Sequence, residues 1–360
     1  MALMMILIMW LGAVTMDADF GAQLDKEHQG ELVQLYRQLT AGYTGGGSIH
    51  WVWLYPRLAL HRWKLALRID VLLKDHIQRK FAERQQSGFT GGKKDRSVLA
   101  LSLQQTEHLD SSILEQTADQ LKSFLFAGHD TTSIVLQWAF YELSRTPRAL
   151  SAIRHELDEL FGPGSSPETV RDMLCSPQSE DLVSRMHYVS AVIKEILRLY
   201  PPSGTARYMN PGSGYNVQLP GDDGQTLCLD GMVVYNCETL VHRDETVYGE
   251  TTHDFMPERW LNTDTSQAPP SSAWRPFERG PRNCIGQELA ILEARVILAC
   301  AVRRYDFVKV GLGAVARNGH GEPIRDAQGR YEVESPLYNV SGKLFFSFLV
   351  LFVILTLSTE

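Results

Sequence analysis

Cys284 lies in a segment whose residue types could support metal chemistry. Residues 276–290 read PFERGPRNCIGQELA, so the cysteine follows a glycine-containing turn and precedes an apolar helix expected from about Gly286. The unpaired N–H groups and the positive dipole end of such a helix favour a thiolate over a thiol. A thiolate is a good metal ligand, whereas an inert, buried cysteine is the alternative interpretation for one cysteine taken alone.

The residues around Cys284 favour the metal-ligand interpretation. Gly280 and Gly286 have no Cβ atom, so the backbone can turn sharply and approach a flat, bulky partner closely. Arg282, two residues before the cysteine, can reach an anionic group on that partner. The segment therefore predicts a site for a planar, negatively charged group held by one sulfur.

A second unusual segment, AGHDTT at residues 127–132, falls inside a helix expected over residues 110–143. A helix interior gains nothing from Gly128 or from two adjacent threonines, and the apolar residues on both sides argue against a solvated patch. Thr131 can turn its hydroxyl toward the carbonyl three or four residues earlier, which loosens that turn. Asp130 and Thr131 are then placed to deliver protons.

The pattern Phe277-x-x-Gly280-x-Arg282-x-Cys284-x-Gly286 resembles the haem-binding loop of the cytochrome P450 monooxygenases, and residues 127–132 resemble their oxygen-activation motif. The resemblance implies a haem b cofactor (iron protoporphyrin) with Cys284 as the proximal thiolate ligand of the iron. It implies that Phe277 packs beside the sulfur and the macrocycle, and that Gly128 lets the haem approach the helix. It also implies that Asp130 and Thr131 relay protons during oxygen activation.

Further residues match the same family. Glu195 and Arg198 in KEILRLYPP, with Arg259 in FMPERW, resemble the family's buried Glu-Arg-Arg network, whose role is architectural. Arg207 occupies a position where family members often bind a haem propionate, as Arg282 also does, although a solvated arginine is an alternative interpretation for Arg207. The histidines at 129 and 242 are interpreted as packed or structural side chains rather than iron ligands.

Hydrophobic periodicity predicts a mainly α fold with small β-sheets, as the resemblance also implies. The helical pattern over residues 110–143 corresponds to a length of about 50 Å, so this helix crosses a whole domain. Turn residues and β-branched runs predict hairpins over residues 216–236. Further amphipathic or apolar helices are expected over residues 62–84, 147–161, 186–199 and 286–303.

Composition excludes several other classes of protein. The 360 residues are 44% hydrophobic and 21% charged, which is typical of a globular chain with a large core. A formal net charge of −7 with dispersed basic residues argues against a nucleic-acid partner. Five cysteines without CxxC spacing argue against a disulfide framework and a zinc knuckle, and favour a reducing compartment.

Both ends of the chain depart from the family pattern. Residues 1–14 are apolar but too few to span a membrane, and are expected to form a buried helix. We expect residues 1–343 to be a partial P450 haem domain without the family's N-terminal anchor and β-rich lobe. Residues 344–360 are an apolar tail, interpreted as a marginal membrane segment over 344–358, a strand or a non-native extension. Gly342-Lys343 would fit a retained intron.

The resemblance implies insertion of one atom of dioxygen into a small, organic and apolar substrate. Electrons would come from NADPH through a flavoprotein reductase, and the protein would associate with the cytoplasmic face of the endoplasmic reticulum membrane. Two alternatives are a haem-thiolate isomerase or dehydratase, which would not need Asp130 and Thr131, and a non-catalytic fragment unable to hold haem.

Overall fold

The computed structural model of the chain describes residues 11–41, 55–87, 96–164, 166–219, 224–261, 269–337 and 352–357. Contacts divide the chain into two compact units, Met1–Ser133 and Ile134–Glu360. Helix α6 (Ser111–Arg145) runs through the boundary between them. Among the described residues, no helix is both long enough and apolar enough to cross a lipid bilayer.

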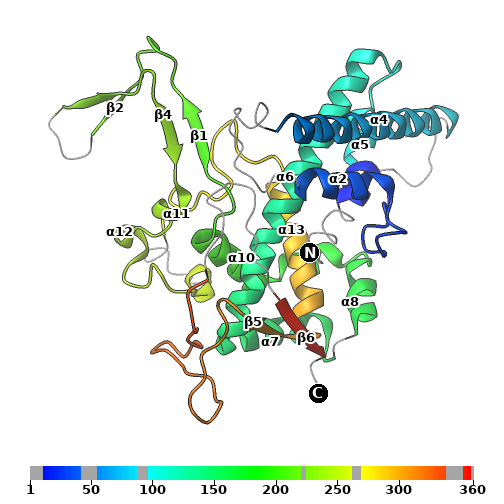
Figure 1. Cartoon of the computed structure of the whole chain (residues 1–360). Helices are drawn as coiled ribbons and strands as arrows, with labels where there is room; N and C mark the ends of the chain where they lie inside the picture. Colours follow the sequence, from blue (N-terminus) through cyan, green and yellow to red (C-terminus); the bar gives the residue numbers. More distant parts are fainter. Residues whose placement is uncertain are drawn as a thin grey trace. The chain divides into compact units, whose positions relative to one another are not determined.

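The first unit is a helical layer built around the N-terminal part of α6 (Figure 1). A helical turn at residues 11–16 is followed by α2 (Glu31–Ala41), α4 (Pro56–Ser87) and α5 (Val98–Ser102). Apolar side chains three to four positions apart form the shared core, as amphipathic helices require. They include Val33 and Tyr36 of α2, Ile69, Leu73 and Ile77 of α4, and Leu121 and Leu125 of α6.

The second unit packs helices around α10 (His187–Leu199), which is buried on nearly every side. Helix α10 contacts α7 (Pro147–Phe161), the 3₁₀ helix η2 (Pro257–Trp260) and α13 (Gln287–Val302). Shorter helices complete the unit: α8 (Pro167–Leu174), α9 (Ser179–Ser184), α11 (Glu238–Val241) and α12 (Glu245–Tyr248).

Three antiparallel two-stranded sheets are described in the second unit. Strand β1 (Thr205–Tyr208) pairs with β4 (Val233–Asn236), so that Thr205 lies opposite Asn236 (Figure 1). Strand β2 (Asn216–Gln218) pairs with β3 (Thr226–Cys228). Strand β5 (Tyr305–Val310) pairs with β6 (Phe352–Leu357). Over those six residues the apolar tail is therefore a strand, which was one of its predicted interpretations.

The predicted helices are present. Of the hairpins predicted over residues 216–236, β2 and β3 form one, whereas β4 pairs with β1 from outside that range. Helix α6 has 35 residues, α7 has the predicted bounds, α10 starts one residue later than predicted, and α13 is one residue shorter than predicted at each end. Helix α4 starts six residues earlier than predicted, because Pro56 begins it and proline is favoured in the first turn, where its missing N–H is not needed. Of the predicted N-terminal helix, residues 1–10 lie outside the described residues, whereas 11–16 are helical.

Candidate active site

Backbone hydrogen bonds shape the turn that carries Cys284. The N–H of Cys284 donates to the carbonyl of Phe277 at 2.9 Å, and the N–H of Asn283 donates to the carbonyl of Gly280 at 3.1 Å. Gly280 adopts a φ of 89°, which a residue with a Cβ atom rarely takes. The turn ends at Gly286, the N-cap residue of α13, so Cys284 stands two residues before that cap.

Cys284 has a free and exposed thiol. A Cβ atom added at Gly280 would meet no atom within 4 Å, and one at Gly286 would meet only the Cys284 sulfur at 3.9 Å. Ile285 is 89% exposed, which is unusual for a large apolar side chain. One open turn, with the apolar side chain of Ile285 next in sequence to the cysteine, therefore carries the predicted residues Phe277, Gly280, Arg282, Cys284 and Gly286.

Arg207 is one of the two predicted cofactor residues outside this turn, and Gly128 is the other. It lies on β1 with an exposed side chain, and its guanidinium donates to the carbonyl of Ala206 at 2.9 Å. Residues two apart on a strand share one face, so Arg207 lies on the face of Thr205, whose hydroxyl donates to Glu278 in the cysteine turn. Arg207 is thus on the face of β1 that meets this turn.

The AGHDTT segment lies on α6 within the first unit. The hydroxyl of Thr131 donates to the carbonyl of Ala127 at 2.8 Å, as the sequence predicts for a loosened turn. Burial raises the pKa of the Asp130 carboxyl to about 6. The Cβ position of Gly128 lies 2.8 Å from the Leu11 side chain, so packing against Leu11 accounts for a glycine here. Its predicted role toward haem stays a prediction.

His129 is buried and packed, as the sequence analysis interpreted it. Its Nδ1 lies 2.8 Å from the Leu125 carbonyl and 3.1 Å from the Tyr36 hydroxyl. Burial lowers the pKa of His129, so the ring is neutral at physiological pH. With Nδ1 engaged by these two oxygens, His129 is held within the first unit.

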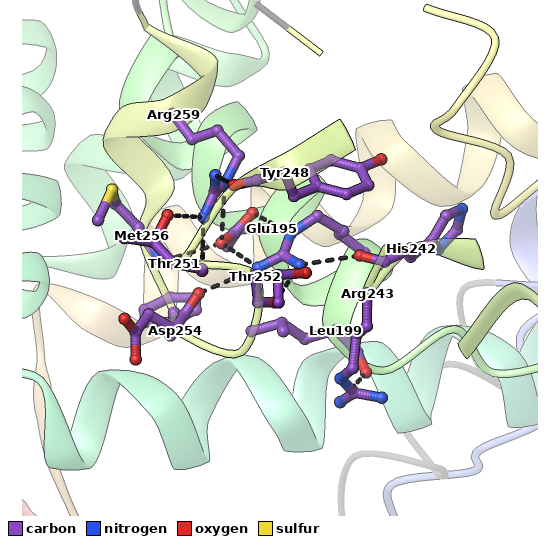
Figure 2. A network of polar contacts seen from close by, with 12 residues as sticks. Glu195, Leu199, His242, Arg243, Tyr248, Thr251, Thr252, Asp254, Met256 and Arg259 are labelled. Atoms are coloured by element: carbon purple, nitrogen blue, oxygen red, sulfur yellow. Dashed lines mark hydrogen bonds and ion pairs between the residues drawn. The ribbon is translucent and has the colours of Figure 1, made fainter. Parts of the chain in front are cut away.

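Glu195 and Arg198 form a fully buried ion pair in the second unit. Figure 2 shows the network of polar contacts around Glu195 in close-up. Arg198 donates two hydrogen bonds to Glu195, at 2.8 and 2.9 Å. Its remaining bonds go to the main-chain carbonyls of His242, Thr252 and Asp254, at 3.0, 2.6 and 3.0 Å. A buried charge is tolerated only with such partners, so this arginine ties α10 to residues 242–254.

Arg259 completes the cluster from η2. Its Nε lies 3.5 Å from a Glu195 oxygen, and its other nitrogens donate to the carbonyls of Tyr248 and Thr251 (Figure 2). The Glu195 carboxylate also accepts the indole N–H of Trp260 at 2.8 Å. The structure thus brings Glu195, Arg198 and Arg259 together.

Two contacts that hold the cysteine turn, made by His242 and Glu278, were not predicted from the sequence. The Nε2 of His242, a residue that is 0% exposed, accepts the N–H of Arg275 at 2.9 Å. Burial lowers the pKa of His242 to about 4, so this nitrogen remains an acceptor. The carboxylate of Glu278 joins the turn to Thr205 of β1 and Asn236 of β4. Both contacts join segments distant in the chain, which no local sequence pattern reports.

Comparison with known proteins decides the family. The sequence pattern described as Cytochrome P450 matches residues 11–317. This chain belongs to the cytochrome P450 family. It is 30% identical over 346 residues to Cytochrome P450 monooxygenase acrF from Aspergillus aculeatus, covering 89% of this chain and 65% of the relative. The chain therefore spans just under two thirds of the length of that curated P450.

Two other matches add to this. The chain is 33% identical over 198 residues to the Bifunctional cytochrome P450/NADPH--P450 reductase of Gibberella moniliformis, covering 54% of this chain and 16% of that protein. The crystal structure of the cytochrome P450DA haem domain matches with a TM-score of 0.65 and 20% sequence identity. It covers 88% of this chain and 63% of that chain, which shows the mainly α P450 fold.

The residues of the cysteine turn fit the haem that the P450 family implies. No group of three or more His, Cys, Asp or Glu residues suited to a metal occurs among the residues that the structure describes. The open glycine and the exposed Ile285 leave room for a flat apolar ring.

Proposed function

We propose that this chain is the haem-thiolate core of a P450 monooxygenase that inserts one atom of dioxygen into a small, apolar organic molecule. The observation that carries the proposal is the exposed, free thiol of Cys284 in an open turn at the start of α13. Haem, when bound there, supplies the activation of dioxygen. The chain's own residues hold the cofactor and manage protons.

Cys284 would hold the iron, and Phe277 would pack beside the sulfur and the ring. Arg282 and Arg207 would pair with the two propionates, because both arginines are exposed and carry charges of the opposite sign. Gly128 would lie against the ring. These assignments follow the match to the family motifs. The open geometry of the turn supports those of the turn residues, whereas that of Gly128 rests on the motif alone.

Asp130 and Thr131 would move protons. With a pKa of about 6, Asp130 exchanges a proton near neutral pH, as an effective general acid does. The Thr131 hydroxyl donates to Ala127 in this structure, so it must turn away from that carbonyl to pass a proton onward. This relay favours a monooxygenase over an isomerase, which has no use for it.

Electrons would come from NADPH through a flavoprotein reductase. The relative from Gibberella moniliformis carries both activities in its name, which supports a reductase partner for this chain.

Association with the cytoplasmic face of the endoplasmic reticulum membrane is part of the proposal. Helix α4 supports it with an exposed apolar stripe of Leu60, Trp63, Leu67 and Val71, while Pro56–Ile69 contains no acidic residue. Sedimentation with anionic vesicles should carry the chain down, and Trp63→Glu should reduce the bound fraction about tenfold, whereas Leu101→Glu on α5 should not. Equal binding of both variants would count against the membrane role of this stripe.

The function is tested with isotopic oxygen. Haem-loaded chain, a P450 reductase, NADPH and a panel of fatty acids and other apolar compounds are incubated under ¹⁸O₂, and the products are weighed by mass spectrometry. We expect products that carry one ¹⁸O atom per molecule. If the chain holds haem through its thiolate and consumes NADPH but gives only isomerised or dehydrated products, the proposal is wrong.

A further inference from the structure

Glu278 has an unusual backbone for its residue type. Its φ is 57°, and among the described residues Asp17 is the one other non-glycine with a positive φ. Side chains with a Cβ atom avoid this left-handed region, where glycine is favoured. A glutamate keeps such a conformation when other contacts hold it there.

The carboxylate of Glu278 makes those contacts with both strands of the β1–β4 sheet. Oε1 accepts the hydroxyl of Thr205 and the side-chain amide of Asn236, the latter at 2.8 Å. Thr205 and Asn236 are register partners at one end of the sheet, where the two strands lie side by side (Figure 1). One carboxylate therefore bridges a pair of strands.

The second oxygen of Glu278 faces its own turn. Oε2 accepts the N–H of Arg279 at 3.3 Å and lies 3.4 Å from the guanidinium of Arg275. The side chain is only 14% exposed. Although burial raises the pKa of this carboxyl, the hydrogen bonds from Thr205 and Asn236 outweigh it and leave the pKa below its usual range. Glu278 is therefore an ionised group that is fully engaged.

The bridge that the Glu278 carboxylate forms between β1 and β4 also affects the peptide bond between Phe277 and Glu278. The carbonyl of Phe277, which belongs to the peptide joining Phe277 to Glu278, accepts the N–H of Cys284 at 2.9 Å. Rotation about the Glu278 N–Cα bond changes the orientation of this peptide relative to the rest of the turn, so the φ of Glu278 and the direction of that carbonyl are linked. The side chain of Glu278 thus controls a hydrogen bond to the residue that would hold the iron.

We infer that Glu278 is a positioning residue for Cys284: its carboxylate fastens the cysteine turn to β1 and β4 and so sets the cysteine at the start of α13. The inference adds to the proposed function, on which the importance of Cys284 rests. It involves no proton transfer. Glu238, the other acid on Asn236, accepts the same amide at 3.2 Å and has no hydrogen bond to the turn among those described.

Hydrogen exchange of the haem-free chain, read by mass spectrometry on peptides covering residues 275–290, tests this directly. We expect Glu278→Gly, which tolerates the positive φ but has no carboxylate, to speed exchange of the Cys284 amide at least tenfold. Thr205→Val should speed it about threefold, since it removes one donor and leaves Glu278 in place. Glu238→Gln is the matched control, because its amide oxygen still accepts from Asn236, and should change nothing.

Peptides of α10 report global unfolding in the same experiment. Exchange that rises equally in α10 and in the turn would show general destabilisation and overturn the inference, as would Glu278→Gly exchanging like the unaltered chain. Thr205→Val keeps the test decisive if Glu278→Gly fails to fold. The result does not need haem, so a chain that binds no haem would refute the proposed function and leave this inference standing.

A second measurement tests whether replacing Glu278 changes how well Cys284 is placed to bind the haem iron. In haem-loaded protein, reduced under carbon monoxide, Glu278→Gly should show a smaller fraction of the thiolate-type absorption band than Glu238→Gln at equal haem content. Equal fractions in the two variants would contradict a positioning role.

Discussion

Asp130 combines burial with an ionisable carboxyl at the centre of α6. Because burial raises its pKa to about 6, the folded state holds a proton that the unfolded chain, with an ordinary Asp pKa near 4, has released. The contribution of Asp130 to the free energy of unfolding is therefore largest below the unfolded pKa, and it is lost as pH rises through about 6. At neutral pH the buried, ionised Asp130 carboxylate therefore destabilises the fold, which favours a role in proton transfer over a structural role.

The variant Asp130→Asn should separate the effect of this carboxyl on stability from its effect on turnover. Above pH 6 the variant should unfold at higher urea concentration than the unaltered chain, and this advantage should shrink toward pH 4. Turnover should fall about 100-fold, the contribution of a general acid. Asp119→Asn, an exposed position on the same helix, should change neither property. A variant that is less stable at pH 8 would show that Asp130 has a stabilising partner instead.

Single residues also show what the sequence could predict. The spacing around Cys284 predicted its turn, because glycines, arginine and cysteine at fixed offsets make a local structure. Glu278 gave no such signal: its φ of 57° and its bonds to Thr205 and Asn236 depend on a sheet whose strands lie far away in sequence. The contact of His242 with Arg275 was invisible for the same reason.

At the scale of elements, α10 is held by hydrogen bonds as much as by apolar packing. Arg198 fills its five donor bonds with Glu195 and three backbone carbonyls, and it is 0% exposed. Lysine has three donors and no planar fork, so it cannot reproduce this set. The chain segment from 242 to 260 depends on that geometry.

Arg198→Lys should therefore lower the free energy of unfolding by about 3 kcal/mol or more, since at least two buried acceptors lose their partner at roughly 1–3 kcal/mol each. Arg171→Lys, in an exposed pair with Asp172, should change it by less than about 0.5 kcal/mol. Urea denaturation followed by circular dichroism measures both. Equal losses would mean that the buried network adds no more than a surface pair.

Elements with a clear period were predictable and the others were not. Helices α6, α7, α10 and α13 followed the spacing of their apolar residues. The start of α4 was missed because Pro56 lies before the first periodic residue. The pairing of β6 with β5 could not be chosen from sequence, because a short apolar run fits a strand, a membrane segment or a tail equally well.

At the scale of the whole molecule, the predicted residues come from both units. Gly128, Asp130 and Thr131 belong to the first unit, and the cysteine turn and the Glu-Arg-Arg network belong to the second. The proposed chemistry draws on both sets, and α6 is the element that runs through both units. The central requirement is that Cys284 is bonded to haem iron through its sulfur.

The absorption spectrum of the haem-loaded chain, reduced under carbon monoxide, tests that requirement most directly. The account predicts the red-shifted Soret band of a thiolate-bound haem in the unaltered chain and in Cys228→Ser, which changes another exposed cysteine. Cys284→Ser should lose that band. If Cys284→Ser keeps the same red-shifted band, Cys284 does not bind the iron and the account is wrong.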